Sequence, residues 1–231
     1  MVWGTYDLGA LFLPTGAIFL ITAAVCLRVT GSVAAALAAS LLKAGLFLFY
    51  FSTWFDGTYG LIDDQTYIRQ GEGLFSKGVG IFTLQDDLPL LLRTANGLHF
   101  GYYLYNIYAI HLFGHGYFAP AALNVLLSVL IAHLGSVIAE REFGFFGTVR
   151  AAFFYFLLLF PDILAWSTFI NGKDVVVLYL HVVLLYGFSL WFQNRTFLAL
   201  SVLIPGSFLL LFFRFYVPLF FWVAFAVAVL T

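Results

Sequence analysis

Two neighbouring carboxylates, Asp63 and Asp64, lie within the longest polar segment of the chain, residues 56–98. An aspartate in a water-facing segment beside a membrane helix can act as a general base toward a hydroxyl group, and a pair of aspartates can instead ligate a hard cation. The same segment holds other charged residues: Asp56, Arg69, Glu72, Lys77, Asp86, Asp87 and Arg93. Acidic residues and glycines are also common in ordinary water-exposed loops outside the membrane. The segment alone is therefore compatible with a catalytic or cation-binding site and with a simple solvated loop.

The composition determines what surrounds this polar segment. Hydrophobic residues make up 63% of the 231 residues and charged residues only 9%, whereas soluble domains average about 25% charged residues. A membrane span needs about 20 apolar residues, so the chain holds at most about seven or eight spans. We therefore predict an all-α, polytopic integral membrane protein that forms a single transmembrane domain over residues 1–231. No basic tract indicates nucleic acid as a partner, and one cysteine excludes an intrachain disulfide or a cysteine metal cluster.

Short polar turns divide the apolar sequence into about seven transmembrane helices. We expect them near residues 8–27, 33–55, 121–139, 148–170, 175–192, 196–213 and 215–231. Between the second and third of these, residues 56–98 are predicted to form a long acidic loop, in which residues 65–71 are compatible with a short helix that begins near Asp63 or Asp64. No polar tail follows the last run, which favours a chain that is one part of a longer protein.

Residues 99–116 combine apolar side chains with three histidines and four tyrosines. This mixture is typical of a helix that lies in the membrane interface, so we predict an interfacial helix there and not a further span. His111 and His115 are four residues apart and would share one helix face, which is a spacing found in metal sites. Because the sequence fixes no third ligand, ordinary interfacial histidines are the default interpretation.

The basic residues of the short loops predict an orientation in the membrane. With residues 99–116 lying flat, one side carries four arginines: Arg28, Arg141, Arg150 and Arg195. The other side carries Lys173, Arg214 and the acidic loop. Since cytoplasmic loops are enriched in basic residues, the acidic loop is expected to face away from the cytoplasm.

Four short stretches follow one another in a recognisable order. They are Asp63-Asp64-Gln65-Thr66-Tyr67, then Leu112-Phe113-Gly114, then Glu140-Arg141-Glu142-Phe143-Gly144, and finally Leu159-Phe160-Pro161 leading through Trp166-Ser167 to Lys173-Asp174. In this order they resemble the N-terminal module of the GT-C superfamily of integral membrane glycosyltransferases. The likeness is greatest to the branch that contains the protein O-mannosyltransferases and the aminoarabinose transferase of lipid A.

The resemblance implies a reaction and a donor. Members of this superfamily transfer a sugar from a polyprenyl-phosphate carrier to a hydroxyl acceptor with inversion at the anomeric carbon. Asp63 then corresponds to the aspartate that takes the acceptor's proton, and Asp64 orients Asp63 or the acceptor. A lipid-linked sugar is the expected substrate, the acceptor is a glycan, a lipid or a protein, and a divalent metal is an open alternative.

The resemblance also implies supporting residues and a location. Arg93, together with Arg69, would hold the donor phosphate, because a guanidinium can neutralise the charge that grows as the glycosyl bond breaks. Asp174, next to Lys173, would assist the site or a metal. The implied location is a bacterial cytoplasmic membrane, with the active site on the extracytoplasmic side and further membrane subunits as conceivable partners.

A different class of function is compatible with the same sequence. The chain could be a noncatalytic membrane subunit or a small transporter, in which three charges in or near spans serve a pathway or an assembly: Lys43, Asp162 and Arg214. For Lys43 the alternatives are a functional cation or a structural one that finds a partner or the interface. Asp162 follows Pro161, which can kink the span and keep the carboxylate near water.

Overall fold

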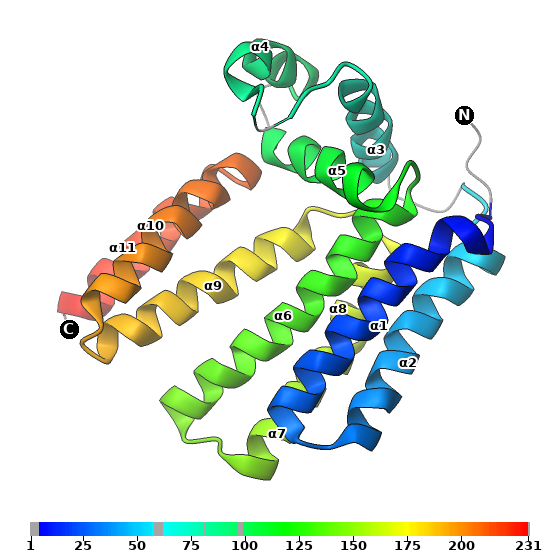
Figure 1. Cartoon of the computed structure of the whole chain (residues 1–231). Coiled ribbons are helices and arrows are strands. Elements are labelled where there is room, and N and C mark those ends of the chain that lie inside the picture. The colour runs from blue at the N-terminus through cyan, green and yellow to red at the C-terminus, as the bar shows by residue number, and fades with distance from the viewer. Residues whose placement is uncertain (1–4, 58–61, 81, 97–98, 231) are drawn as a thin grey trace.

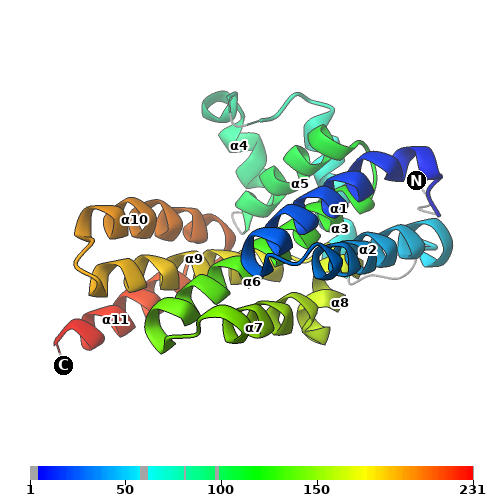
Figure 2. The same ribbon diagram turned by 60° about the horizontal axis from the view of Figure 1, so that its bottom comes forward.

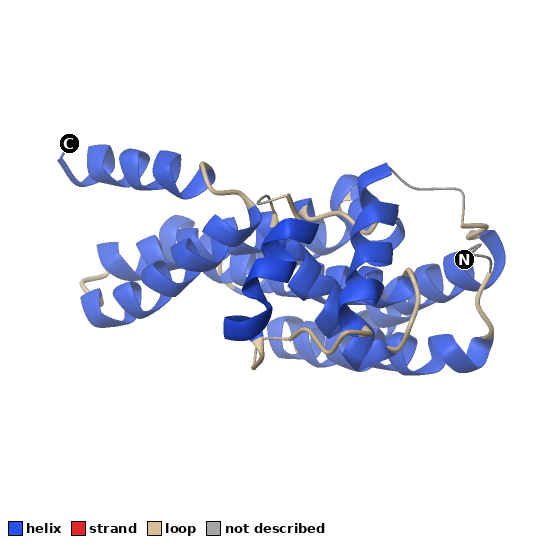
Figure 3. Cartoon of the chain, turned by 90° about the horizontal axis from the view of Figure 1, so that it is seen from above, coloured by secondary structure: helices blue, strands red, loops and turns tan. Residues whose placement is uncertain are grey.

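The computed structural model describes residues 5–57, 62–80, 82–96 and 99–230 (Figure 1). In these residues the chain contains helices and connections but no strand, as the view from above also shows (Figure 3). The helices are α1 Leu8–Thr30, α2 Val33–Phe49 with the π-helical turn η1 Tyr50–Trp54, α3 Ile62–Phe75, α4 Leu84–Thr94, α5 Phe100–Phe113, α6 Phe118–Phe143, α7 Gly147–Leu159, α8 Pro161–Phe169, α9 Asp174–Phe192, α10 Thr196–Phe213 and α11 Val217–Leu230. The prediction of an all-α chain is confirmed for this part of the sequence.

Five helices are long and apolar enough to cross a membrane: α1, α2 with η1, α6, α9 and α10. A sixth crossing results if α7 and α8, which are bent by 46° at their junction, are counted as one span. The described residues therefore contain the helices of an integral membrane protein, with five or six candidate spans where about seven were predicted. The last apolar run forms α11, which has 14 residues and is about 21 Å long at 1.5 Å per residue, shorter than a bilayer core of about 30 Å.

Pro161 causes the break between α7 and α8. A proline lacks the backbone N–H that would continue the helix, and its ring disfavours helical geometry at the residue before it. Phe160 accordingly has φ −57° and ψ 124°, outside the helical region. The single span expected over residues 148–170 is therefore two helices, with Pro161 in the first turn of α8.

The long helices pack side by side, and a smaller group of helices covers one end of them. Helices α1 and α2 lie on one side of α6, and α9 and α10 lie on the other (Figure 2). At one end, α5 runs across the bundle, and α3 and α4 lie beyond it (Figure 1). The connections α1–α2, α6–α7 and α9–α10 all lie at the opposite end, where Arg28, Arg141, Arg150 and Arg195 are found. The grouping of charges by end thus agrees with the sequence prediction.

The polar segment 56–98 is mostly helical where the structure describes it, so the expected loop is not found. Helix α3 extends beyond the short helix considered for residues 65–71, with Asp63 and Asp64 in its first turn, where carboxylates are favourable beside the helix dipole. Gly71 lies inside helix α3 and not in a loop. It allows α3 to pack closely on α5, because a Cβ atom at this position would lie 3.0 Å from Asn106 Cβ on α5. Gly57 and Gly78, by contrast, lie in a bend and a turn with positive φ, so glycine indicated a turn at some positions of this segment and not at others.

Residues 99–116 contain a helix that is too short to span a bilayer. Helix α5 has 14 residues, or about 21 Å, and crosses the ends of the long helices (Figure 1). Its most extensive contacts are with α3, α6 and α10, and it also touches α1 and α4. This geometry agrees with a segment that does not cross the membrane, and its interfacial position remains a prediction.

The crossing of α5 and α10 depends on Gly101, so we predict that Gly101→Val destabilises the fold. A Cβ atom at Gly101 would lie 2.8 Å from Phe212 Cβ and 3.1 Å from the Phe212 carbonyl oxygen. Overpacking of this kind costs about 1–3 kcal/mol, which should lower the midpoint of thermal unfolding in detergent. Gly73→Ala on α3 is the control, because a Cβ atom there meets nothing within 4 Å. Equal midpoints for the two variants would contradict the prediction.

Candidate functional site

Six polar side chains from four parts of the chain lie close enough to influence one another electrostatically at the end of the bundle that carries α3 and α5. They come from the first turns of α3, from the residue before α5, from the start of α9 and from the residue after α10. We call them the charged cluster: Asp63, Tyr67, His99, Lys173, Asp174 and Arg214. The cluster joins residues that are more than 100 positions apart in the sequence, such as Tyr67 and Lys173.

Lys173 and Tyr67 form the centre of the charged cluster. The Lys173 ammonium donates a hydrogen bond of 2.7 Å to the Tyr67 hydroxyl and lies 5.3 Å from the centre of its ring. Burial lowers the pKa of Lys173, and Arg214 lowers it further, while Asp174 and Asp63 oppose this. Burial raises the pKa of Tyr67 to about 12, with Asp63 and Asp174 adding to the increase. Lys173 is therefore a partly desolvated amine that would gain from an anionic ligand.

Arg214 and Asp174 form an ion pair at the edge of the charged cluster. The guanidinium Nη2 lies 2.5 Å from Asp174 Oδ1, and Nη1 donates to the Tyr216 hydroxyl at 3.0 Å. Asp174 is in the first turn of α9, and Arg214 follows the last residue of α10. Each side chain therefore has the charge that interacts favourably with the helix dipole beside it. Both side chains remain partly exposed to solvent, and an exposed pair of this kind contributes little to stability. Its main effect is to hold two opposite charges at the site.

The structure separates the two neighbouring carboxylates of α3. Successive residues on a helix point about 100° apart, so one carboxylate can enter the core while the other stays outside. Asp64 is only 2% exposed and accepts a hydrogen bond of 3.2 Å from the Tyr117 hydroxyl. Asp63 is exposed and acts electrostatically on Lys173 and His99. Only Asp63 is thus available to a substrate, and Asp64 belongs to the supporting structure.

A buried hydrogen-bond network beneath the charged cluster centres on Asn171. Its Nδ2 donates to Asn106 Oδ1 at 2.9 Å and to the Asp64 carbonyl at 3.2 Å, while its Oδ1 accepts from the Tyr102 hydroxyl at 2.6 Å. Its backbone N–H donates to the Tyr117 hydroxyl at 3.0 Å. The network connects α3, α5, the residue before α6 and the link between α8 and α9. It therefore fixes the position of α3, and with it Asp63, relative to Lys173.

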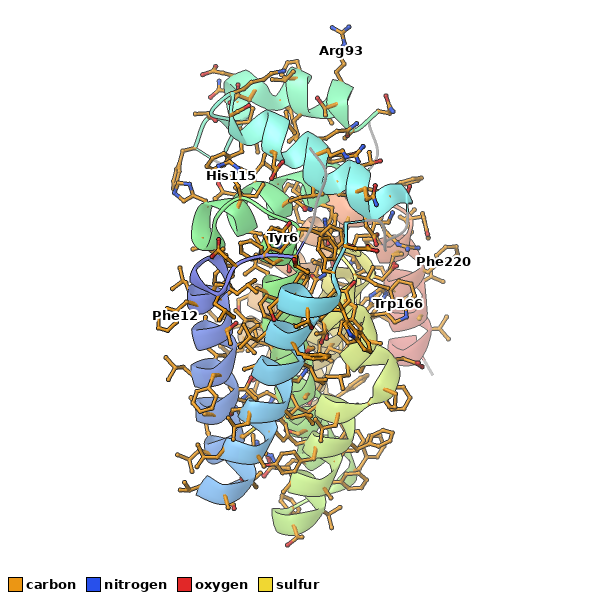
Figure 4. The ribbon with its side chains drawn as sticks, turned by 90° about the vertical axis from the view of Figure 1, so that its right-hand side faces the viewer. Tyr6, Phe12, Arg93, His115, Trp166 and Phe220 are labelled. Carbon is orange, nitrogen blue, oxygen red and sulfur yellow. The ribbon has the colours of Figure 1, made fainter. Side chains whose placement is uncertain are left out.

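Two predicted phosphate ligands do not join the charged cluster. Arg69 is exposed on α3, and its Nη2 lies 3.5 Å from Gln65 Oε1 one helical turn away. Arg93 is exposed in the last turn of α4 and points away from the rest of the molecule (Figure 4). The reason is that α4 lies beyond α5 at this end of the bundle, and its last turn carries Arg93 away from Asp63. The cations that the fold does bring there are Lys173 and Arg214.

An open groove runs beside the charged cluster between α8 and α9. It has a volume of about 340 Å³ and is lined by Asp162, Ile163, Trp166, Asp174, Val175 and Leu178. Asp174 belongs both to this groove and to the charged cluster. Trp166 lies on the side of the bundle (Figure 4) and, like Leu178, is 39% exposed. The groove therefore offers apolar walls next to a charged end, which is the form that an amphiphilic molecule requires.

The structure also gives the positions of the residues considered for a metal site and of the three charges considered for a transport pathway or an assembly. Among the described residues, no group of three or more His, Cys, Asp or Glu could hold a metal ion, and His115 lies 4.0 Å from Glu72. Of the three charges considered for a pathway, Arg214 belongs to the charged cluster and Asp162 to the groove. Lys43 is fully buried and donates a hydrogen bond of 2.8 Å to Ser128 Oγ, which connects α2 to α6.

Two residues of the site were not among the candidates named from the sequence. His99 was interpreted only as one of several interfacial histidines, and Asn171 only as part of a polar turn. Their partners are remote, since His99 Nδ1 contacts the Phe213 carbonyl oxygen at 2.5 Å and Asn171 reaches α3 and α5. A polar residue beside a helix end was the one feature that could have drawn attention to either.

The fold and this site together define an all-helical protein with membrane-spanning helices and a charged cluster at one end. The chain matches no protein-family model, no curated protein and no solved structure. The chemistry of the site must therefore support the functional assignment.

Proposed function

We propose that this chain is a membrane glycosyltransferase, or the donor-binding part of one, that transfers a sugar from a polyprenyl-phosphate donor to a hydroxyl acceptor with inversion. One observation carries the proposal. An exposed carboxylate, Asp63, lies in one cluster with the cations Lys173 and Arg214, and this cluster shares Asp174 with an apolar groove. A base, phosphate-binding cations and room for a lipid chain are the three requirements of this reaction.

In the proposed reaction, Asp63 takes the proton of the acceptor hydroxyl. The acceptor oxygen then forms a bond to the anomeric carbon from the side opposite the phosphate, which inverts that carbon. The bond between the anomeric carbon and the phosphate oxygen breaks, and its electron pair stays on the polyprenyl phosphate. Lys173 and Arg214 stabilise the negative charge that grows on this leaving group. In this proposal Lys173 and Arg214 take the role first considered for Arg93 and Arg69.

The groove between α8 and α9 supports a lipid-linked donor. Its walls are provided by apolar side chains such as Ile163 and Leu178, which suit an isoprenoid chain. Its charged end at Asp174 meets the charged cluster, where the phosphate would bind. In this arrangement the donor keeps its chain in the bilayer while its sugar reaches Asp63.

The distribution of basic residues supports an orientation. Four arginines lie at the end opposite the charged cluster, Arg195 in a short connection and Arg28, Arg141 and Arg150 in the helix turns next to such connections, and basic residues at these positions usually face the cytoplasm. We accordingly propose that the charged cluster faces the extracytoplasmic side of a bacterial cytoplasmic membrane, with α5 in the interface. The acceptor would then be a glycan, lipid or protein of the cell envelope.

The direct test is transfer by the purified protein in nanodiscs. A set of radiolabelled polyprenyl-phosphate sugars is offered with alcohol acceptors, and the released polyprenyl phosphate and the glycosylated acceptor are measured. We expect transfer from at least one donor, with inversion at the anomeric carbon of the product. No transfer from any donor of the set would count against the proposal.

Filling the groove should weaken binding of the lipid chain, so we predict that Leu178→Trp raises the KM for a long-chain donor by roughly tenfold, which is about 1.4 kcal/mol of binding energy. A short-chain, water-soluble donor does not occupy the groove and should keep its KM. Leu185→Trp is the matched control, since Leu185 is exposed on the same helix but does not line the groove. An unchanged KM for the long-chain donor in Leu178→Trp would exclude this groove as its binding site.

The second candidate function, a transporter or noncatalytic subunit, is favoured by one observation. Among the described residues, Lys43 is a fully buried cation within a span, and no carboxylate lies within ion-pair distance of it. Intramembrane charges of this kind often belong to a pathway or an assembly. Under this alternative, Lys43→Met would abolish function while Asp63→Asn would leave it intact, which is the reverse of what the transferase predicts.

A further inference from the structure

His99 is held in a geometry that fixes which of its ring nitrogens carries a proton. It precedes α5 with φ 53° and ψ 24°, a left-handed conformation that is uncommon for residues other than glycine. Its Nδ1 lies 2.5 Å from the Phe213 carbonyl oxygen at the end of α10. A carbonyl oxygen can only accept a hydrogen bond, so Nδ1 must be the donor and carry the proton. In the neutral ring, Nε2 then has a free lone pair and can act as a base.

The charges around His99 favour this neutral form. Burial lowers the pKa of His99, and Lys173 at the start of α9 and Arg214 at the end of α10 lower it further. The hydrogen bond to Phe213 and the carboxylate of Asp63 on α3 act in the opposite direction, but the pKa remains below the ordinary value for histidine. A half-buried imidazole that is neutral near pH 7, with Nε2 not hydrogen-bonded to any described residue, is suited to accept a proton.

We infer that Nε2 of His99 is a second proton acceptor of this site, beside Asp63. The inference rests on the proposed transferase function, and it specifies which residue finally holds the proton of the acceptor hydroxyl. Asp63 takes the proton as the acceptor's O–H bond breaks and its oxygen bonds to the anomeric carbon, and the proton then passes from Asp63 to Nε2 of His99, because an imidazole is ordinarily a stronger base than a carboxylate. The imidazolium that results lies among the groups that bind the departing phosphate, so its new positive charge stabilises that product.

A purely structural role for His99 makes a different prediction. If the residue only caps α5 and bonds to Phe213, then an asparagine should replace it, because its side-chain amide can donate to the same carbonyl and asparagine tolerates a left-handed backbone. His99→Asn thus keeps the conformation and the hydrogen-bond donor, and removes only the titrating Nε2. The matched control is His111→Asn, because His111 is exposed further along α5 and is not part of the charged cluster.

The experiment measures kcat/KM against pH for the full chain in nanodiscs, with the donor that supports transfer. For the unmodified protein we expect the rate to fall as the pH drops below about 6.5, the ordinary histidine pKa, with the midpoint shifted downward from it. His99→Asn should lower kcat/KM at pH 7 by about 10²-fold and remove this acid limb. His111→Asn should keep both the rate and the limb. Histidine ¹⁵N spectra provide a second readout and should show His99 protonated at Nδ1.

The outcomes separate this inference from the proposed function. Transfer by the unmodified protein together with an unchanged rate and acid limb in His99→Asn would overturn the role of His99 and leave the transferase standing. Histidine ¹⁵N spectra that show neutral His99 protonated at Nε2 would also overturn that role, and this result would need no activity measurement. Failure of the unmodified protein to transfer from any donor would overturn both.

Discussion

Asp63→Asn is expected to lower the rate of sugar transfer by about 10³-fold, within the range of about 10² to 10⁴ found when a general base is removed. The amide has the size of the carboxylate but cannot accept the acceptor's proton. Because Asp63 is exposed, its replacement removes no core contact, and the protein should fold as before. The rate is measured at a saturating concentration of the lipid-linked donor, so that a change in donor binding does not contribute.

The chain offers a closely matched control for this substitution. Asp86 is also an exposed aspartate in the first turn of a helix at the same end of the bundle, and it is also followed by a second aspartate. Asp86→Asn changes the net charge by the same amount and should leave the transfer rate within a factor of two or so, since surface substitutions are usually neutral. If the two variants transferred sugar equally well, Asp63 could not be the base.

Asn171→Ala is expected to destabilise the protein by about 3–5 kcal/mol. The substitution removes three side-chain hydrogen bonds and leaves buried polar groups of Tyr102, Asn106 and Asp64 without this partner, each at about 1–3 kcal/mol. Thermal or denaturant unfolding in detergent should show the loss directly. Transfer should also fall, because α3 is no longer held in its position relative to Lys173.

The control for Asn171 is Gln85→Ala on α4. Gln85 is exposed, and a surface substitution of this kind usually changes stability by less than about 0.5 kcal/mol. A midpoint for Asn171→Ala that matches that of Gln85→Ala would show that the buried network does not hold this end of the bundle together.

The membrane helices were largely predictable because length and apolar composition are sufficient to define a span. The runs that became α1, α2, α6, α9 and α10 needed no tertiary contact to be recognised. The run after Arg214 was overestimated, since its helix begins only at Val217. The run that contains Pro161 was predicted as one span that the proline could kink, and the structure bends it by 46° into α7 and α8, which together can still form one crossing.

The site was predictable only in part, because its residues come together through the fold. Asp63, Lys173 and Asp174 were named from the sequence, and the structure brings them into one cluster. Arg93 was named because the family resemblance implied it, but helix α4 carries it outward. His99 depends on a carbonyl group 114 residues later, and no local pattern contains that information.

The balance of charge in the cluster has a consequence for selectivity. Two acidic residues, Asp63 and Asp174, accompany two basic ones, Lys173 and Arg214, so the resting site has no excess of positive charge. A free inorganic anion therefore gains little by entering, since it must compete with Asp174 for Arg214. A phosphate that is tethered to a hydrophobic tail gains additional binding energy from the groove. If the donor is the proposed lipid-linked phosphate, its discrimination from the abundant soluble phosphates would follow from the tail and not from the head group.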